Sequence, residues 1–423
     1  MPRNEPSDSR PGPAPSRVYY GWIILSVAML AVFVASPGQT YVVSVFVGPI
    51  ERDTGWSRTL ISGLYTAGSL TAAAAILLVG RLMDRFGARA TLTGAGLALG
   101  LTALWMSRVA SPLDLYLGFA LLRLLGQGAL TVVPTAMVAL WFVRLRGRAL
   151  ALTSLGAIAG QAVFPPLVHL LIVRTDWRTA WMMLALVVWG LLLPALLWVR
   201  RSPESIGLLP DGDVPRTERA REPQAAPLAR EEEWTLAEAL RARAFWLLIV
   251  AVASHSLIST ALTFHHVSFM NSLGIDSAAA ATVFTVIAPS SLAGTFLAGI
   301  LVDRIAGRYL LAVAQACLAG AMLWAISIAQ PWQAFVYGGI LGFTSGFGAT
   351  LQAVIWPNYF GRRHVGSIRS AAAIGMMASA AIGPLPFGWL SDLTGSYRTT
   401  TLAFLIFPLV SALAGLAARP PRK

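Results

Sequence analysis

The sequence predicts an all-α polytopic membrane protein with twelve transmembrane helices in two parallel halves of six helices each. Hydrophobic residues make up 56% of the 423 positions and charged residues only 12%, and the mean hydropathy of +0.66 is far above that of soluble domains. Twelve apolar stretches are each long enough for a hydrocarbon core of ~30 Å, which takes about 20 helical residues to cross. A charged loop recurs at half the chain length, which indicates that the halves arose by duplication.

The apolar stretches give the order of the predicted helices. They lie at residues 20–47, 58–80, 89–108, 113–142, 148–171 and 178–199 in the first half, and at 244–270, 277–300, 309–328, 333–356, 367–390 and 399–418 in the second. Stretches this long and unbroken do not match a membrane β-barrel, whose strands have about 10 residues of alternating hydrophobicity.

The repeated loop is Gly80-Arg81-Leu82-Met83-Asp84-Arg85, which returns 219 positions later as Gly299-Ile300-Leu301-Val302-Asp303-Arg304. The two copies follow the second and the eighth predicted helix. Other pairs keep nearly the same offset: Arg89 with Arg308, Gly126 with Gly346, and Gly128 with Gly348. Because both halves run in the same direction, an axis along the membrane normal would relate them.

The charge distribution predicts the orientation in the membrane. Basic residues outnumber acidic ones by 32 to 19, a formal charge of +13 that could suggest a nucleic-acid partner. However, 25 basic residues fall on one side of the predicted bilayer, 6 on the other, and Arg123 within it. By the positive-inside rule, both termini are cytoplasmic. We therefore expect a multi-pass protein of the bacterial inner membrane that contacts lipid and binds no nucleic acid.

The polar segments divide the chain into domains. We expect a disordered cytoplasmic tail over residues 1–18, six-helix bundles over 19–200 and 235–418, a cytoplasmic linker over 201–234, and a short tail over 419–423. Thr235 and Glu238 have capping-box spacing, which predicts a short helix at the end of the linker. Cys317 is the only cysteine, so neither a disulfide nor a cysteine metal site is expected, and no metal or cofactor is predicted.

Two motifs connect the chain with a known family. The first loop reads G-x-x-x-D-R-x-G-x-R, with its fixed positions at Gly80, Asp84, Arg85, Gly87 and Arg89, and the fourth helix contains R-x-x-G-Q-G, beginning at Arg123. With twelve helices in two halves, these motifs resemble the major facilitator superfamily. The resemblance implies transport by alternating access, with the loops closing the cytoplasmic side. It assigns gating to Gly80, Asp84, Arg85, Arg89, Gly299, Asp303, Arg304 and Arg308.

Finer features narrow the resemblance. Tyr20-Gly21-Trp22, Gly55-Trp56-Ser57-Arg58 and the segment 360–369 are similar to bacterial members of the monocarboxylate and oxalate:formate branch. The usual anion site of that branch is not reproduced: Ser291 and Thr295 stand where animal monocarboxylate carriers have an Asp and an Arg. The helix-eight and helix-eleven segments also lack the basic residues of oxalate exchangers.

Arg123 is the most informative single residue. It lies near mid-membrane, where an arginine costs roughly 2.5 to 3.5 kcal/mol to insert, so it must face the protein interior and find a partner. All 19 acidic residues fall at helix ends, in loops or in tails. Four kinds of partner stay open: backbone carbonyls of a first helix broken near Pro37-Gly38, Gln127 or another polar side chain, water, or an anionic substrate.

Without a mid-membrane carboxylate, histidines are the leading candidates for carrying a proton. His255 and the pair His265-His266 lie on the seventh helix, and the pair cannot both face a cavity because neighbours on a helix point about 100° apart. The family resemblance favours His265. Polar residues expected at cavity depth complete the binding candidates: Gln39, Tyr41, Tyr65, Gln127, Gln161 and Ser291.

The sequence carries no nucleophile elbow, phosphate-binding loop or metal-ligand spacing, so an enzyme is not expected. The favoured hypothesis is a monomeric secondary active transporter that moves a small organic anion with a proton. A proton-coupled efflux antiporter for drug-like compounds is the first alternative, and a non-transporting membrane sensor or scaffold is the second.

Overall fold

The computed structural model describes residues 19–212, 234–302, 304–361 and 364–421, and over these residues the chain folds into helices. The expected tail over residues 1–18, most of the linker and Asp303 lie outside the described residues. The N-terminal half contains α1 (Gly21–Val34), η1 (Ser36–Gly38), α2 (Thr40–Thr54), α3 (Arg58–Met106), α4 (Pro112–Leu122), η2 (Arg123–Ala129), α5 (Leu130–Trp141), α6 (Arg146–Arg174), α7 (Trp177–Ala195) and η3 (Leu196–Trp198).

Two short 3-10 helices, η4 (Glu204–Ile206) and η5 (Pro210–Gly212), follow the N-terminal half. The C-terminal half contains α8 (Leu236–Arg241), α9 (Arg243–Ser272), α10 (Ser277–Thr282), α11 (Phe284–Val302), α12 (Gly307–Ile326), α13 (Pro331–Phe360), α14 (Val365–Ile382), α15 (Pro384–Thr394), α16 (Tyr397–Phe404) and α17 (Ile406–Ala417). The capping box predicted for α8 is confirmed: Thr235 and Glu238 hydrogen-bond each other's backbone.

The predicted fold class is confirmed. In the described part of the chain, ten helices are long and apolar enough to cross a membrane. The first crossing is broken into α1, η1 and α2 at the sequence Ser36-Pro37-Gly38, and the second and third crossings run together as α3. A break at Gly87, whose φ of 81° favours glycine, separates the two parts of α3. The second predicted helix, 58–80, therefore ended too early, because the helix continues to the break at Gly87.

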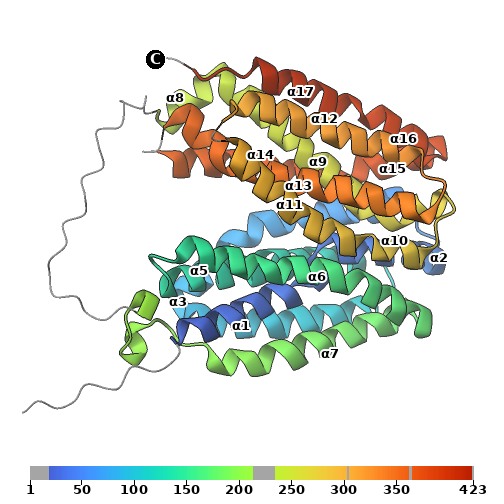
Figure 1. The fold of residues 1–423 in the computed structure, drawn as a ribbon. Helices are drawn as coiled ribbons and strands as arrows, with labels where there is room; N and C mark the ends of the chain where they lie inside the picture. The colour runs from blue at the N-terminus through green and yellow to red at the C-terminus, as the bar shows by residue number, and fades with distance from the viewer. Residues whose placement is uncertain (1–18, 213–233, 303, 362–363, 422–423) are drawn as a thin grey trace, which may run out of the picture.

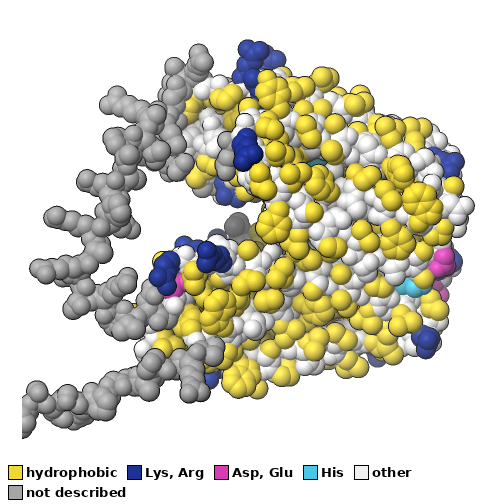
Figure 2. Space-filling model, viewed as in Figure 1, with side chains coloured by type: hydrophobic (Ala, Val, Ile, Leu, Met, Phe, Trp, Pro, Cys, Tyr) yellow, Lys and Arg dark blue, Asp and Glu magenta, His cyan; other side chains and the backbone are white. Residues whose placement is uncertain are grey.

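The two halves lie one above the other in Figure 1. The start of α1, the segment after α7, α8 and the end of α17 share one end of the molecule, which we call the linker end. Away from that end, α2 and α15 pack across the halves against α9 and α3, respectively. Figure 2 shows that the halves separate at the linker end, where a hollow opens between them.

A carboxylate fastens the start of the linker to the N-terminal half. Asp211 accepts hydrogen bonds from the backbone N–H groups of Val143, Arg144 and Leu145, at 3.0, 2.7 and 3.1 Å. Burial opposes ionisation of the Asp211 carboxyl, but these three donors outweigh it and hold its pKa below the ordinary value. The linker therefore begins from a fixed point beside the loop before α6.

Candidate functional site

A cavity of about 400 Å³ lies between the halves and takes its lining from both of them. Small side chains make up much of the wall, with a few polar groups among them, as is usual for small-molecule sites. The lining residues are Ser69, Ala72, Ala73 and Ile76 from α3, Arg123, Gln127, Gly128 and Val132 from η2 and α5, Ser256 from α9, and Met376, Met377, Ala380 and Ala381 from α14.

Arg123 is the charged residue of this wall, and it is only 9% exposed. Its Nη1 donates to the carbonyl oxygen of Gly38 and to the hydroxyl of Thr40, both at 3.3 Å. Its guanidinium carbon lies 5.3 Å from the ring centre of Tyr65, at the distance of a cation–π contact. The Tyr65 hydroxyl in turn lies 2.7 Å from that of Thr40.

The backbone around Arg123 explains this geometry. η2 is a π-helical turn, a wider turn that often occurs at functional sites. A Cβ on Gly126 would lie 2.7 Å from the Cα of Gly38, and a Cβ on Gly38 would lie 2.2 Å from the carbonyl oxygen of Leu122. Only glycines at both positions let η1 and η2 touch. This contact brings the free carbonyl of the broken first crossing within reach of Arg123.

Some N–H donors of the Arg123 guanidinium form no hydrogen bond with the described protein. An arginine carries five N–H donors, and both hydrogen bonds of Arg123 to the described protein leave from one nitrogen, Nη1. Among the described residues no carboxylate pairs with it. Nε and Nη2 are thus available beside the cavity. Of the partners considered for Arg123, a backbone carbonyl and a polar side chain are present, and they are compatible with an anionic substrate because they anchor only one side of the guanidinium.

The other polar candidates divide between cavity and packing. Gln127 lines the cavity and is exposed to it, whereas Tyr65 is fully buried beneath Arg123. Tyr41 hydrogen-bonds Ser36 at 3.0 Å. Ser291 lies against α13, because its carbonyl oxygen would be 1.8 Å from a Cβ on Gly346. Gln39, the residue that follows η1, and Gln161, on α6, are both half-buried.

The three helix-seven histidines are all buried in α9 and do not line the cavity. The Nε2 of His265 lies 3.0 Å from the carbonyl oxygen of Pro384, and its Nδ1 lies 3.2 Å from the hydroxyl of Tyr397. His266 contacts the carbonyl oxygen of Ala280 at 2.9 Å. His255 lies 3.4 Å from the Ser259 hydroxyl. From the sequence, His265 was favoured as the histidine that faces the cavity. In this structure its ring is instead packed between Pro384 and Tyr397.

Polar contacts close the end opposite the linker end. Asp392, on α15, accepts hydrogen bonds from the N–H and the hydroxyl of Thr59, at 2.8 and 2.7 Å. Thr59 lies in the first turn of α3, where a carboxylate interacts favourably with the helix dipole. Beside it, Arg58 pairs with Glu51 at 3.1 Å and lies 5.2 Å from the ring centre of Tyr397. These contacts join the two halves.

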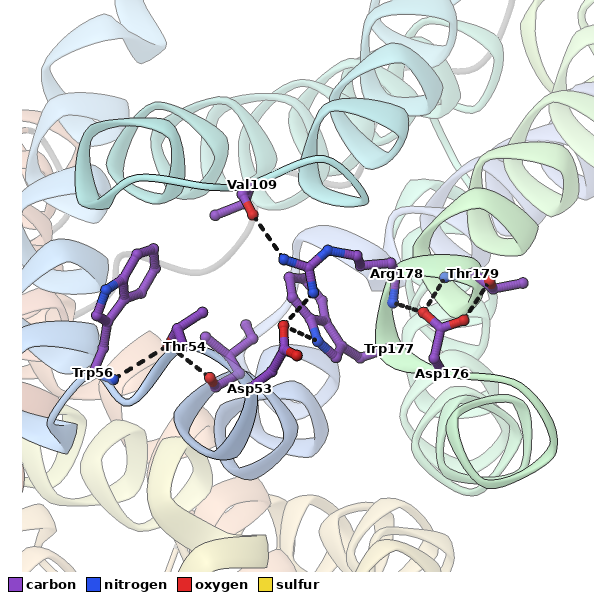
Figure 3. Close-up of polar contacts among 9 residues, drawn as sticks. Asp53, Thr54, Trp56, Val109, Asp176, Trp177, Arg178 and Thr179 are labelled. Atoms are coloured by element: carbon purple, nitrogen blue, oxygen red, sulfur yellow. Dashed lines mark hydrogen bonds and ion pairs between the residues drawn. The ribbon is translucent and has the colours of Figure 1, made fainter.

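A second cluster at that end lies within the N-terminal half (Figure 3). Arg178 pairs with Asp53 on α2 and donates to the carbonyl oxygen of Val109 at 3.2 Å. Asp176 caps α7 by accepting from the backbone N–H of Arg178 and of Thr179, at 2.7 and 3.0 Å. Hydrogen bonds from Thr179 hold the pKa of Asp176 below its ordinary value. The cluster ties three helix ends into one unit.

The repeated loops lie at the linker end. Arg85 lies over the Phe86 ring at 5.2 Å, and Arg308 contacts the hydroxyl of Tyr309 at 2.9 Å. Gly80 and Gly299 face open space, since a Cβ on either would meet no atom within 4 Å. Arg89 and Arg304 are exposed. The side chain of Asp84 lies outside the described part, as does Asp303.

Several site residues were missed from the sequence. Thr40 joins Arg123 to Tyr65, and its place two residues after Gly38, at the start of α2, was the available signal. Met376 and Met377 line the cavity from α14 without a distinguishing sequence pattern. The pairing of Thr59 with Asp392 spans 333 positions, so no local motif could have predicted it.

Comparison with known proteins agrees with this architecture. A family model described as Major Facilitator Superfamily matches residues 28–288 and, in a second match, residues 258–423. Monocarboxylate transporter 12 of Rattus norvegicus is 24% identical over 427 residues, which cover 92% of this chain and 82% of the transporter. The oxalate:formate antiporter of Oxalobacter formigenes is 26% identical over 267 residues, which cover 63% of this chain and 58% of the antiporter.

Solved structures extend the similarity to the whole fold. The crystal structure of a bacterial homologue of the human lysosomal transporter Spinster, in an inward-facing and unoccupied conformation, has a TM-score of 0.71. The match covers 95% of this chain and 97% of that chain at 14% sequence identity. At this identity the similarity concerns the fold alone.

Proposed function

The chain belongs to the major facilitator superfamily, and on this premise we propose that it moves a small, monocarboxylate-like organic anion together with a proton. It is a membrane transporter of this superfamily and not an enzyme. The carrying observation is Arg123, a buried cation beside the cavity with unused donors and no carboxylate partner in the described chain. Charge-assisted hydrogen bonds from arginine suit a carboxylate.

The proposed mechanism is alternating access of residues 19–200 against 235–418, with the linker end in the cytoplasm and the protein a monomer in the bacterial inner membrane. In this orientation the structure is the state open to the cytoplasm, closed at the other end by contacts such as Thr59 with Asp392. The cavity volume of about 400 Å³ suits a small substrate.

The repeated loops are proposed to close the cytoplasmic side in the opposite state. This role is supported by Gly80 and Gly299. In the open state no atom lies within 4 Å of where a Cβ would stand on either residue, so packing in this state does not require glycine there. Small residues let helices approach closely in membranes, so both glycines would be used when the halves close. Such a gate argues against a sensor or scaffold that no longer cycles.

Proton movement is the second part of the proposal. No carboxylate lines the cavity among the described residues, which disfavours a cation/proton antiporter. His255 and His265 stay candidates for coupling, in the C-terminal half.

Uptake of a labelled carboxylate panel into proteoliposomes, with and without an imposed pH gradient, tests the proposal. Arg123→Gln should weaken carboxylate binding by at least about tenfold, since a hydrogen bond to a charged group contributes ~1.5 to 3 kcal/mol. Arg398→Gln, an exposed arginine at the opposite end, is the matched control and should leave uptake unchanged. Extrusion of cationic dyes without any carboxylate uptake would favour efflux; no movement of either would favour the sensor.

A further inference from the structure

A second pocket, of about 470 Å³, lies in the C-terminal half at the linker end, apart from the central cavity. It is formed by α8, the start of α9 and the chain just after α17. Each of these elements contributes one arginine: Arg241, Arg243 and Arg419. All three are exposed, and none makes a hydrogen bond or ion pair with another described residue. Figure 2 shows Lys and Arg side chains gathered at the linker end.

Among the described residues, the pocket lining also includes one carboxylate, Glu238, which is engaged in the helix cap. Its Oε2 accepts hydrogen bonds from the N–H and the hydroxyl of Thr235, at 2.7 and 3.0 Å. Three cations therefore face one anion whose oxygen is already occupied by the start of α8. The described residues that line the pocket therefore carry a net positive charge.

Neighbouring contacts hold the three arginines around the pocket. The indole N–H of Trp246 on α9 donates to the carbonyl oxygen of Leu240 at 2.8 Å, which fastens the end of α8 to α9. Tyr359 donates its hydroxyl to the carbonyl oxygen of Ala418 at 2.8 Å, next to Arg419. The backbone beneath each arginine is thus fixed, and only the long side chains must be ordered by a ligand.

The apolar surroundings favour an amphiphilic ligand. Trp246 is 56% exposed on α9, and Leu413 and Leu416 are 67% and 41% exposed on α17. Tryptophan is enriched where membrane helices meet the headgroup region, and exposed leucines mark the hydrocarbon side. The helices that border the cationic pocket thus also carry exposed apolar side chains suited to contact acyl chains. A soluble anion would use only the first of these features.

We propose that this pocket binds the phosphate headgroup of an anionic phospholipid, with its acyl chains lying along α9 and α17. Arginine forks match phosphate oxygens, and basic pockets at helix ends are known to hold anionic headgroups. The proposal concerns this surface alone and does not depend on the substrate that the transporter moves.

The test measures thermal stabilisation of the purified full chain by short-chain phosphatidylglycerol, phosphatidylcholine and inorganic phosphate, each titrated separately. Phosphatidylglycerol should stabilise at the lowest concentration. Each arginine replaced by Gln should weaken its apparent binding about fivefold, the contribution of one basic residue near an anionic membrane. Arg148→Gln is the matched control, because Arg148 is an exposed arginine of the same end in the N-terminal half, on α6.

Three outcomes would overturn the proposal. Equal stabilisation by phosphatidylcholine would mean that binding does not depend on the negative charge of the headgroup. Equal stabilisation by inorganic phosphate would assign the pocket to a soluble phosphate compound. Equal loss in Arg148→Gln and Arg419→Gln would reduce the effect to general positive charge. Because each variant changes a single exposed side chain, its own melting temperature without lipid separates loss of binding from loss of folding.

Discussion

Arg123, Thr40 and Tyr65 form a chain of polar contacts that orients the cationic group of the cavity. The Thr40 hydroxyl lies between the guanidinium and the phenol, at 3.3 and 2.7 Å. A buried guanidinium has little freedom when a carbonyl, a hydroxyl and a ring each limit it. Its unused donors are then presented to the cavity in one direction.

Thr40→Val removes the hydroxyl that links the two residues while keeping the branched shape. We expect the KM for the transported anion to rise about two- to tenfold, the value of one hydrogen bond of ~0.5 to 1.5 kcal/mol. Initial uptake rates over a range of substrate concentrations measure it. Thr66→Val is the control, because the buried Thr66 hydroxyl has no hydrogen-bond partner among the described residues. Equal effects of both changes would contradict the orienting role of Thr40.

At the level of elements, two irregular turns make the site. η1 breaks the first crossing and frees the Gly38 carbonyl, and η2 widens the fourth crossing at Arg123. A regular helix in place of η1 would use the Gly38 carbonyl in its own backbone hydrogen bonds and leave that acceptor unavailable to the arginine. The glycines at 38 and 126 permit the contact between these turns.

The end of the second crossing, in α3, offers a test of the gate. Gly80→Leu should leave the melting temperature unchanged, because a side chain there meets open space in the present state. Transport should fall at least tenfold, since the larger side chain would obstruct closure of the linker end. Gly94→Leu, on the same element and also facing open space, is the matched control. Normal transport by Gly80→Leu would remove this position from the gate.

Across the whole molecule, the closed end and the open end differ in the chemistry that joins the halves. Toward the closed end, Asp392 of α15 accepts hydrogen bonds from Thr59 in the first turn of α3. The rings of Tyr65 and Phe264 also meet between the halves, with their centres 4.5 Å apart. The open end has the cavity and the exposed loops. The polar contact is the part that a cycling transporter must break.

Cysteines in place of Thr59 and Asp392, with Cys317 changed to Ala, test this contact between the halves. Their hydrogen-bonded positions should let oxidation or a short bifunctional reagent join the halves. Joined protein should lose transport, because the closed end cannot open, and a reducing agent should restore it after oxidation. Each single cysteine variant serves as a control. Full transport by the joined form would show that this end does not open during the cycle.

The sequence predicted much of the fold and less of the site. Hydropathy and the repeat are local or periodic, so they predicted the two halves. Short local patterns predicted the rest: Pro37-Gly38 the break in the first helix, and the spacing of Thr235 and Glu238 the capped α8. Arg123 and Gln127 could be chosen because a polar residue in an apolar stretch is visible without coordinates. The position of His265 could not be, because its surroundings come from Pro384 and Tyr397, more than a hundred residues away.

The sequence by itself determined that this protein crosses a membrane in two related halves and that one arginine is placed among apolar residues. The free energy of placing each segment in lipid depends on its own side chains, so these properties are readable along the chain. Only the tertiary structure decided which groups meet: Gly38 with Arg123, Asp392 with Thr59, and His265 with Tyr397. Such contacts depend on helix packing across the chain, where a carbonyl or a carboxylate gains its partner from a distant segment.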